Sequence, residues 1–258
     1  MTCELVIFDW AGTLIDHGCR APLVAFLDAF EACGLPIDEA TARKPMGAHK
    51  RDHVVEILGE PAVADRARSS LGRAPDDAMV EQIYETFTKR LLDVLPSHAT
   101  PIPGVVATLQ ELQARGLSLG GTTGYTRQMM DRVQPLAEEA GVRLDAVLCA
   151  DEVPQSRPAP WACFRIAELL GRYPLHGAVK VGDTPADMAE GKNAGMRTVG
   201  ISATGNEVGL DEAALAALPD GERAERIDAA YARLTAAGAD AVLASVSDLP
   251  AWIDATAR

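Results

Sequence analysis

The sequence contains no long apolar run, although 48% of its 258 residues are hydrophobic. A membrane-spanning helix needs about 20 consecutive apolar residues, so we expect no membrane contact. The first apolar run begins at residue 5, which leaves no room for a cleavable secretion signal ahead of it. These absences predict a cytoplasmic protein with a sizeable core.

Basic residues are scarce, with 24 Lys and Arg against 37 Asp and Glu, which gives a formal net charge of −13. Nucleic acids and anionic membranes attract basic surfaces, so neither is expected as a partner. A small anionic substrate is still compatible with this charge, because the cations and metal ions of a site decide what it binds.

Paired cysteines are also absent. Disulfide frameworks and zinc sites use even sets of cysteines at regular spacings. The five cysteines here are scattered without a CxxC pair, at Cys3, Cys19, Cys33, Cys149 and Cys163. We therefore expect reduced thiols, as in other cytoplasmic proteins.

The stretch Leu5–Asp16 combines a short apolar run with a carboxylate. Leu5–Phe8 is uninterrupted and apolar, which is typical of a buried parallel strand. Asp9 follows at the carboxyl end, where open α/β sheets bind ligands. A carboxylate in this place can attack phosphorus as a nucleophile, or it can cap the following helix.

From residue 103 onward, apolar strands alternate with helical patterns. Further strands are predicted at 117–124, 146–149, 178–181, 198–201 and, as an edge strand, 241–243. Strands that alternate with helices predict an α/β fold with a doubly wound, Rossmann-like parallel sheet. Residues 211–238 are expected to be helical and carry no recognised motif.

Between residues 21 and 96 the apolar spacing becomes helical throughout. A first helix is indicated by Leu23, Phe26, Leu27 and Phe30, a second from Pro45 to Leu58 with proline in its first turn, and a further one over 78–95. This pattern predicts a helical cap domain at 17–98, inserted into a core formed by 1–16 and 99–258.

Two segments of the predicted core end strands in polar residues. Thr122-Thr123-Gly124 offers a hydroxyl and exposed amides that could hold a phosphoryl oxygen, and Tyr125 could line the pocket or simply pack. Arg157 precedes a proline and could be a surface residue, but its forked guanidinium suits a phosphoryl group.

The segment Val179–Asp187 is the strongest signal downstream. An apolar strand ends in Gly-Asp, and a second Asp follows four residues later. If a helix begins near Pro185, the carboxylates of Asp183 and Asp187 face the same point above the sheet. Such a pair suits Mg²⁺, whereas the alternative is two acids that favour a helix dipole.

Taken in order, these motifs resemble the haloacid dehalogenase superfamily, whose first motif reads Asp-x-Asp-Gly-Thr. The resemblance implies that Asp9 is the nucleophile and that Thr123 and Arg157 bind the phosphoryl group. It also implies that Mg²⁺ is ligated by Asp9, the carbonyl oxygen of Ala11 and Asp183, with support from Asp187. One departure is plain, because Ala11 stands where the motif has its second Asp.

The departure resembles the phosphonatase branch of the superfamily, which cleaves the carbon–phosphorus bond of phosphonoacetaldehyde. The matching residues are Ala11, Cys19, Met46, Gly47, Lys50 and His53. The resemblance implies a Schiff base on Lys50, with His53 assisting proton transfers, and a homodimer formed through cap helices. Helical spacing predicts Met46, Lys50 and His53 on one helix face. Without this pattern, Lys50 would be read as a solvated surface lysine.

Ala11 and Lys50 are chemically consistent with each other. In phosphatases of the superfamily the second Asp protonates a departing alkoxide, whereas cleavage of a carbon–phosphorus bond leaves a carbanion. An imine on Lys50 accepts those electrons as an enamine, so no acid is needed there. Three alternatives stay open: a Mg²⁺-dependent phosphomonoesterase or mutase, a binding protein that keeps the fold, and a Schiff-base lyase without phosphorus chemistry.

Overall fold

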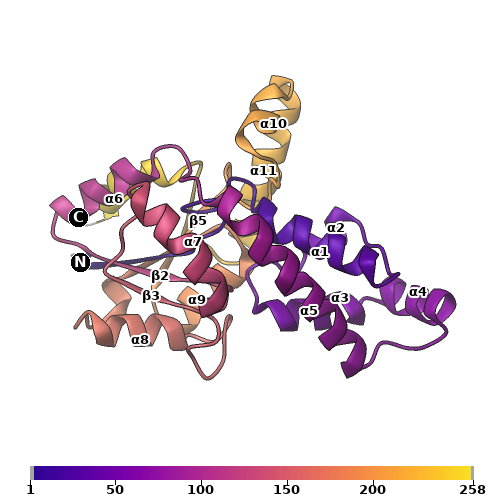
Figure 1. Cartoon of the computed structure of the whole chain (residues 1–258). Helices are drawn as coiled ribbons and strands as arrows, with labels where there is room; N and C mark the ends of the chain where they lie inside the picture. The colour runs from indigo at the N-terminus through magenta and orange to yellow at the C-terminus, as the bar shows by residue number, and fades with distance from the viewer. Residues whose placement is uncertain (1–2, 257–258) are drawn as a thin grey trace.

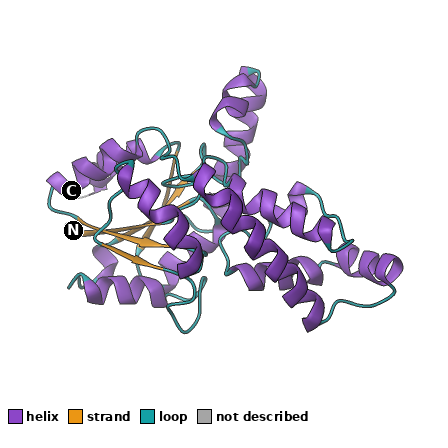
Figure 2. Ribbon diagram, in the orientation of Figure 1, coloured by secondary structure: helices purple, strands orange, loops and turns teal. Residues whose placement is uncertain are grey.

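The computed structural model describes residues 3–256. Helices cover both faces of a six-stranded sheet, and a separate group of helices lies beside it (Figures 1 and 2). All strand pairs are parallel, in the order β3-β2-β1-β4-β5-β6. The strands are β1 (Leu5–Phe8), β2 (Ser118–Thr122), β3 (Ala146–Leu148), β4 (Val179–Gly182), β5 (Arg197–Ile201) and β6 (Ala241–Leu243). The predicted Rossmann-like sheet is confirmed, with β6 at its edge.

The strand order changes direction beside β1, since β2 and β3 lie on one side of it and β4 to β6 on the other. Ligands of such sheets bind at this switch point, beyond the carboxyl ends of the strands. The helices of the core are α6 (Val105–Ala114), α7 (Arg127–Glu139), α8 (Trp161–Leu169), α9 (Pro185–Asn193), α10 (Glu212–Ala217), α11 (Asp220–Ala236) and α12 (Leu249–Thr256), with 3-10 turns η1 (Leu95–His98), η2 (Leu175–Gly177) and η3 (Val246–Asp248).

The cap is the group of five helices at the right of Figure 1. It consists of α1 (Arg20–Ala32), α2 (Glu39–Arg43), α3 (Lys50–Gly59), α4 (Pro61–Leu71) and α5 (Asp77–Val94). In its interior, the ring of Phe26 stacks on Phe87 with centroids 4.0 Å apart. The helical spacing indicated an apolar stripe on each of α1 and α5, and in the structure these two stripes pack against each other.

The helix that the sequence pattern predicted over Pro45–Leu58 corresponds to α3, and it begins five residues later than predicted. We expected it to start at Pro45, but α3 starts at Lys50. Gly47 has a φ of 92°, a left-handed conformation that a helix cannot contain. Met46 therefore lies on a loop and not on the helix face, although its sulfur is 3.9 Å from the Lys50 amine.

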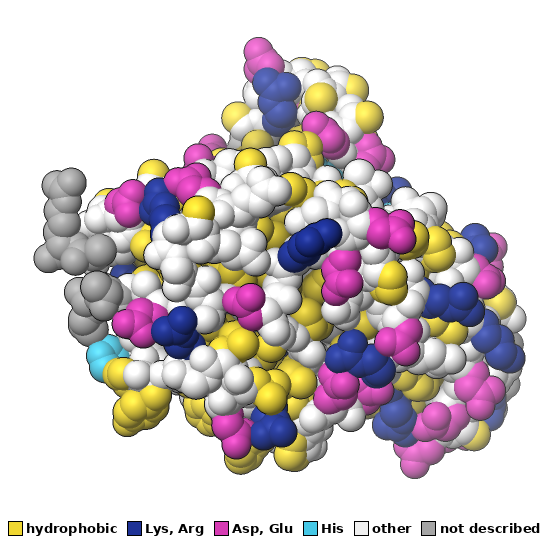
Figure 3. Space-filling model, turned by 60° about the vertical axis from the view of Figure 1, so that its left-hand side comes forward, with side chains coloured by type: hydrophobic (Ala, Val, Ile, Leu, Met, Phe, Trp, Pro, Cys, Tyr) yellow, Lys and Arg dark blue, Asp and Glu magenta, His cyan; other side chains and the backbone are white. Residues whose placement is uncertain are grey.

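The predicted helical segment 211–238 is divided into α10 and α11, which project from the core (orange in Figure 1). The break falls at Leu218-Pro219, where proline cannot continue the first helix. Acidic and basic side chains are interspersed on the face of the molecule in Figure 3. Among the described residues, no helix has both the length and the apolar character needed to cross a membrane.

Two connections join the cap to the core, and they run side by side. The amide of Ile102 donates to the carbonyl of Leu14 at 2.9 Å, and Ile15 pairs with Pro101. On the other side, the amide of Gly18 donates to the carbonyl of Thr204 at 2.7 Å. These contacts fix where the cap approaches the carboxyl ends of the strands.

Candidate active site

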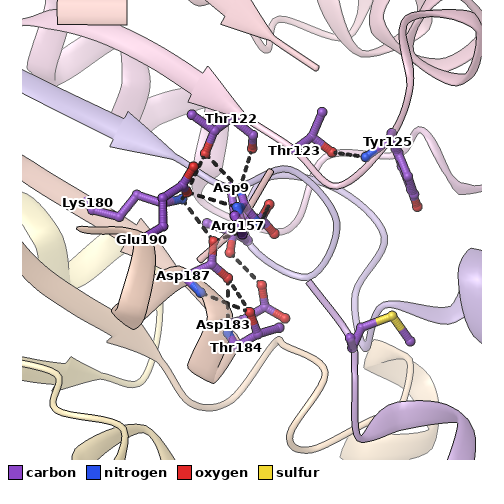
Figure 4. A network of polar contacts seen from close by, with 12 residues as sticks. Asp9, Thr122, Thr123, Tyr125, Arg157, Lys180, Asp183, Thr184, Asp187 and Glu190 are labelled. Carbon is purple, nitrogen blue, oxygen red and sulfur yellow. Dashed lines mark hydrogen bonds and ion pairs between the residues drawn. The ribbon is translucent and has the colours of Figure 1, made fainter. Parts of the chain in front are cut away.

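A small pocket lies where the cap meets the carboxyl ends of β1, β2 and β4. Most of the residues predicted for the site line it, and Figure 4 shows the polar network below it. The lining residues are Asp9, Ala11, Cys19, Met46, Gly47, Lys50, Thr123, Gly124, Tyr125, Arg157 and Thr184. The pocket therefore draws on both parts of the molecule.

Asp9 directly follows β1 and is 5% exposed. Its amide donates to the carbonyl of Val181 at 2.9 Å, which anchors the residue between β1 and β4. Its carboxylate pairs with Arg157 at 2.8 Å and caps no described helix. Burial raises the pKa of Asp9, and the charge of Arg157 offsets part of that effect. The carboxylate faces the pocket, as a nucleophile must.

Arg157 is not a surface residue, because its side chain is only 2% exposed. All three of its guanidinium nitrogens contact oxygen atoms of the core. Its Nε lies 2.8 Å from Glu190, and one terminal nitrogen lies 2.8 Å from Asp9 and 2.9 Å from Asp187. The other donates to the carbonyl and hydroxyl oxygens of Thr122, both at 2.7 Å. The surrounding carboxylates raise its pKa well above the usual value, so it is a permanent cation of the site.

Three buried carboxylates converge on one point, because Asp9, Asp183 and Asp187 each offer an oxygen within 4.8 Å of the others. Asp187 pairs with Lys180 at 2.9 Å through one oxygen, and the other accepts from the Thr184 hydroxyl at 2.6 Å. The same two residues form the capping box of α9, in which the Thr184 amide donates to the Asp187 carboxylate at 3.2 Å and the Asp187 amide donates to the Thr184 hydroxyl at 3.3 Å. The two readings of Asp187 are therefore compatible, because the residue both caps the N-terminus of α9 and belongs to the carboxylate cluster.

Asp183 has only neutral partners among the described residues. Its two oxygens accept from the Thr13 hydroxyl at 2.9 Å and from the Asn206 amide at 2.7 Å. Burial and the charges of Asp9 and Asp187 raise its pKa well above the usual value. A divalent cation would supply the missing positive charge and prefers such oxygen ligands, so the cluster is compatible with a metal ion.

Lys50 opens α3 and is 3% exposed. Its amine lies 3.9 Å from the sulfur of Met46 and 5.4 Å from the centroid of the Tyr125 ring, and no carboxylate of residues 3–256 forms an ion pair with it. Burial lowers its pKa. A larger share of neutral amine makes this lysine a suitable nucleophile toward a carbonyl group.

Three further residues that line the pocket carry polar hydrogens. Burial and nearby carboxylates raise the pKa of both Cys19 and Tyr125 well above their usual values, so both stay protonated. The Tyr125 hydroxyl is buried and has no hydrogen-bond partner among the described residues. The Thr123 hydroxyl accepts from the Tyr125 amide at 3.1 Å. The pocket therefore contains neutral donors that a bound substrate can use.

Comparison with known proteins agrees with these observations. The family model of haloacid dehalogenase-like hydrolases matches residues 6–201. A phosphonoacetaldehyde hydrolase from Nitratidesulfovibrio vulgaris is 43% identical over 243 residues, 94% of this chain and 87% of its own length. One from Bacillus cereus is 42% identical over 249 residues, 96% of this chain and 94% of its own. The chain belongs to the phosphonoacetaldehyde hydrolase family of haloacid dehalogenase-like hydrolases.

The same family relationship extends to three-dimensional structure. The crystal structure of a phosphonoacetaldehyde hydrolase-like protein from Oleispira antarctica superposes with a TM-score of 0.95 at 36% identity. The match covers 99% of this chain and 94% of the other. Cap and core therefore have the same arrangement in both proteins.

In this family member, His53 does not line the pocket, contrary to the role we predicted for it. Its ring stacks on Phe26 with centroids 3.9 Å apart, and its Nε2 lies 2.8 Å from the carbonyl oxygen of Ala42. Burial and the charge of Lys50 lower its pKa well below the usual value. The structure therefore places His53 as a neutral residue of the cap interior, packed on Phe26 about one helical turn beyond Lys50.

Four residues of the network were missed by the sequence analysis. Lys180 and Glu190 are buried and bind the cluster from below, whereas Thr13 and Asn206 orient Asp183. Two of them had a local signal, since Lys180 interrupts the apolar strand Val179–Val181 and Thr13 is the threonine of the Asp-x-Asp-Gly-Thr motif. A charged residue inside a buried strand indicates a paired partner.

Proposed function

We propose that this protein hydrolyses the carbon–phosphorus bond of phosphonoacetaldehyde to acetaldehyde and phosphate. Support comes from relatives of that name at about 42% identity over nearly the full length. The observation that carries the proposal is a buried lysine, Lys50, which lies in the same small pocket as Asp9 and has no anionic partner among residues 3–256. A phosphate ester needs no amine for its hydrolysis, but an aldehyde next to a phosphonate does.

The reaction begins on the cap side of the pocket. The lone pair of the Lys50 amine attacks the aldehyde carbon, and loss of one water gives a protonated imine. The neutral hydroxyl of Tyr125 and thiol of Cys19 belong to residues that line the same pocket, and both can donate hydrogen bonds. The imine nitrogen then serves as the electron acceptor for the next step.

The core side of the pocket breaks the bond. An oxygen of Asp9 attacks phosphorus, the carbon–phosphorus bond breaks, and its electron pair moves through carbon to the imine nitrogen as an enamine. The enamine takes a proton on carbon, and one water hydrolyses the imine to acetaldehyde and free Lys50. A second water hydrolyses the aspartyl phosphate. The sum is one water consumed for each substrate.

Charge on the phosphoryl group is balanced by residues of the core. Arg157 is a fixed cation next to Asp9, and the Thr123 hydroxyl lines the pocket. The carboxylates of Asp9 and Asp183, with the carbonyl oxygen of Ala11, would hold Mg²⁺, and Asp187 would support them. When bound, Mg²⁺ supplies positive charge toward the phosphoryl oxygens.

The decisive experiment measures phosphate and acetaldehyde release from phosphonoacetaldehyde with Mg²⁺. Wild type should release both in equal amounts, and Lys50→Arg and Asp9→Ala should release neither. Borohydride with substrate should trap wild type and Asp9→Ala but leave Lys50→Arg unmodified, because only the amine forms the imine. If wild type leaves the phosphonate intact but hydrolyses phosphate esters, the protein is a phosphatase and the proposal fails.

A further inference from the structure

One arginine of the cap reaches across to the core, outside the pocket itself. Arg43 ends α2, and its side chain is 14% exposed. One terminal nitrogen donates to the carbonyl of Gly18 and to the side-chain oxygen of Asn206, both at 3.0 Å. The other donates to the carbonyl of Gly209 at 2.8 Å. The cap is thus tied to a core segment 163 positions away.

The core segment is shaped to receive this guanidinium. Gly209 has a φ of 74°, and a Cβ at that position would lie 2.8 Å from the guanidinium carbon. Asn206 in turn donates from its side-chain nitrogen to the carbonyl of Arg43 at 3.4 Å. The next residue, Lys44, pairs with Glu60 inside the cap and with no other acid of the part of the chain that the structure describes, and its side chain is 60% exposed. The fit is specific to Arg43.

The residues bound by Arg43 lead directly to the carboxylate cluster. The amide of Asn206 donates to Asp183 at 2.7 Å, so the same residue contacts Arg43 with its side chain and Asp183 with its backbone. On the cap side, residues 44–49 run from Arg43 to Lys50 and bring Gly47 and Met46 to the pocket. Arg43 therefore stands between the two halves of the site.

We propose that Arg43 is a positioning residue that holds the closed cap on the segment 206–209 and so fixes Lys50 and Asp183 together. Its forked guanidinium joins three carbonyl or amide oxygens, one from the connection at Gly18 and two from the core segment 206–209, which a single-point cation cannot match. Its ion pair with Glu39, at 3.9 Å and on a half-exposed carboxylate, contributes little by comparison. The proposal rests on the proposed function only for its kinetic readout.

The first test uses the full chain without substrate. Hydrogen exchange followed by mass spectrometry should show the amides of 205–210 exchanging about tenfold faster in Arg43→Ala than in wild type, with α5 unchanged. Mg²⁺ alone, titrated by calorimetry, should bind severalfold more weakly, because Asp183 loses part of its support. Lys44→Ala is the matched control and should behave as wild type. Arg43→Lys should be intermediate, because lysine keeps the charge without the fork.

The second test is a double-mutant cycle on phosphonoacetaldehyde turnover. Arg43→Ala and Asn206→Ala should each lower kcat/KM by about tenfold or more, and the double variant should lose no more than the worse single one. Equal exchange of the amides of 205–210 in wild type and in a folded Arg43→Ala would overturn the proposal. So would a loss of kcat/KM in the double variant that equals the sum of the two single losses in free energy. If Arg43→Ala does not fold, Arg43→Lys supplies the same comparison. If wild type lacks phosphonatase activity, the exchange and Mg²⁺ measurements still decide the role of Arg43.

Discussion

At the scale of single residues, the site is built from buried charges that share partners. Arg157 contacts Asp9, Asp187 and Glu190, and Lys180 contacts Asp187 at 2.9 Å and Glu190 at 3.4 Å. Each cation thus stabilises more than one carboxylate in surroundings where an unpaired charge is costly. Removing one member should therefore affect the folded state as a whole.

Glu190→Gln tests this network. The change removes one anion from beneath Arg157 and Lys180, so we expect a loss of about 3 kcal/mol in the free energy of unfolding. Glu168→Gln is the control, because Glu168 pairs with Arg165 on the surface and its side chain is 69% exposed. That change should cost less than about 1 kcal/mol. Urea denaturation measures both, and equal costs would show that the buried network does not stabilise the fold.

The pKa of Lys50 gives a second prediction at this scale. Burial lowers this pKa, while the charge of Asp9 raises it. Borohydride trapping with phosphonoacetaldehyde should therefore fall off on the acid side at a pH below the usual lysine value of about 10.4. In Asp9→Ala the midpoint should move lower still, because the anion that favours the ammonium form is gone. A midpoint that stays in place or rises in the variant would contradict the assigned environment.

At the scale of elements, the sequence predicted what depends on local pattern. Apolar runs identified β1 and β4, the second of them interrupted only by Lys180. The residues that follow these strands, Asp9 and Asp183, meet at the switch point of the sheet. The predicted start of α3 was wrong. The apolar spacing of 46–58 indicates a helix face, but it does not reveal that Gly47 has a left-handed conformation that keeps the helix from starting earlier. The contact of Arg43 with Asn206 had no local signal, since folding alone brings them together.

The loop before α3 must fit closely against the core. A Cβ on Gly47 would lie 2.5 Å from the hydroxyl oxygen of Thr184, and its φ of 92° already disfavours other residues. Gly47→Ala should therefore lower phosphonoacetaldehyde turnover by about a hundredfold, because the cap cannot close on α9. The measurement is kcat/KM together with a thermal melt.

Gly72→Ala is the matched control for this loop. Gly72 also has a left-handed φ, of 69°, but no atom lies within 4 Å of the added Cβ. The backbone cost of about 1 kcal/mol should appear in the melt of both variants. Turnover should stay at the wild-type level in Gly72→Ala. A similar loss of turnover in the two would assign the effect to backbone strain and not to the contact with Thr184.

At the scale of the whole molecule, acidic residues outnumber basic ones by 13, and the imbalance extends into the site. Arg157 and Lys180 compensate Asp9, Asp187 and Glu190, which leaves Asp183 with neutral donors alone. Its raised pKa means that, without metal, the folded protein holds this proton more tightly than the unfolded chain does. The contribution of Asp183 to stability therefore falls as the pH rises from its usual pKa through the raised one.

Mg²⁺ should take the place of that proton. The increase in melting temperature between EDTA and saturating Mg²⁺ should be larger at about pH 8 than at about pH 5.5, since protons compete with the metal for the carboxylate. In Asp183→Asn the increase should be small at both pH values. Asp228→Asn, on the exposed face of α11, should keep the wild-type response. Only the folded protein brings these carboxylates together. If the increase in melting temperature with Mg²⁺ is the same at both pH values and is unchanged in Asp183→Asn, the metal binds elsewhere.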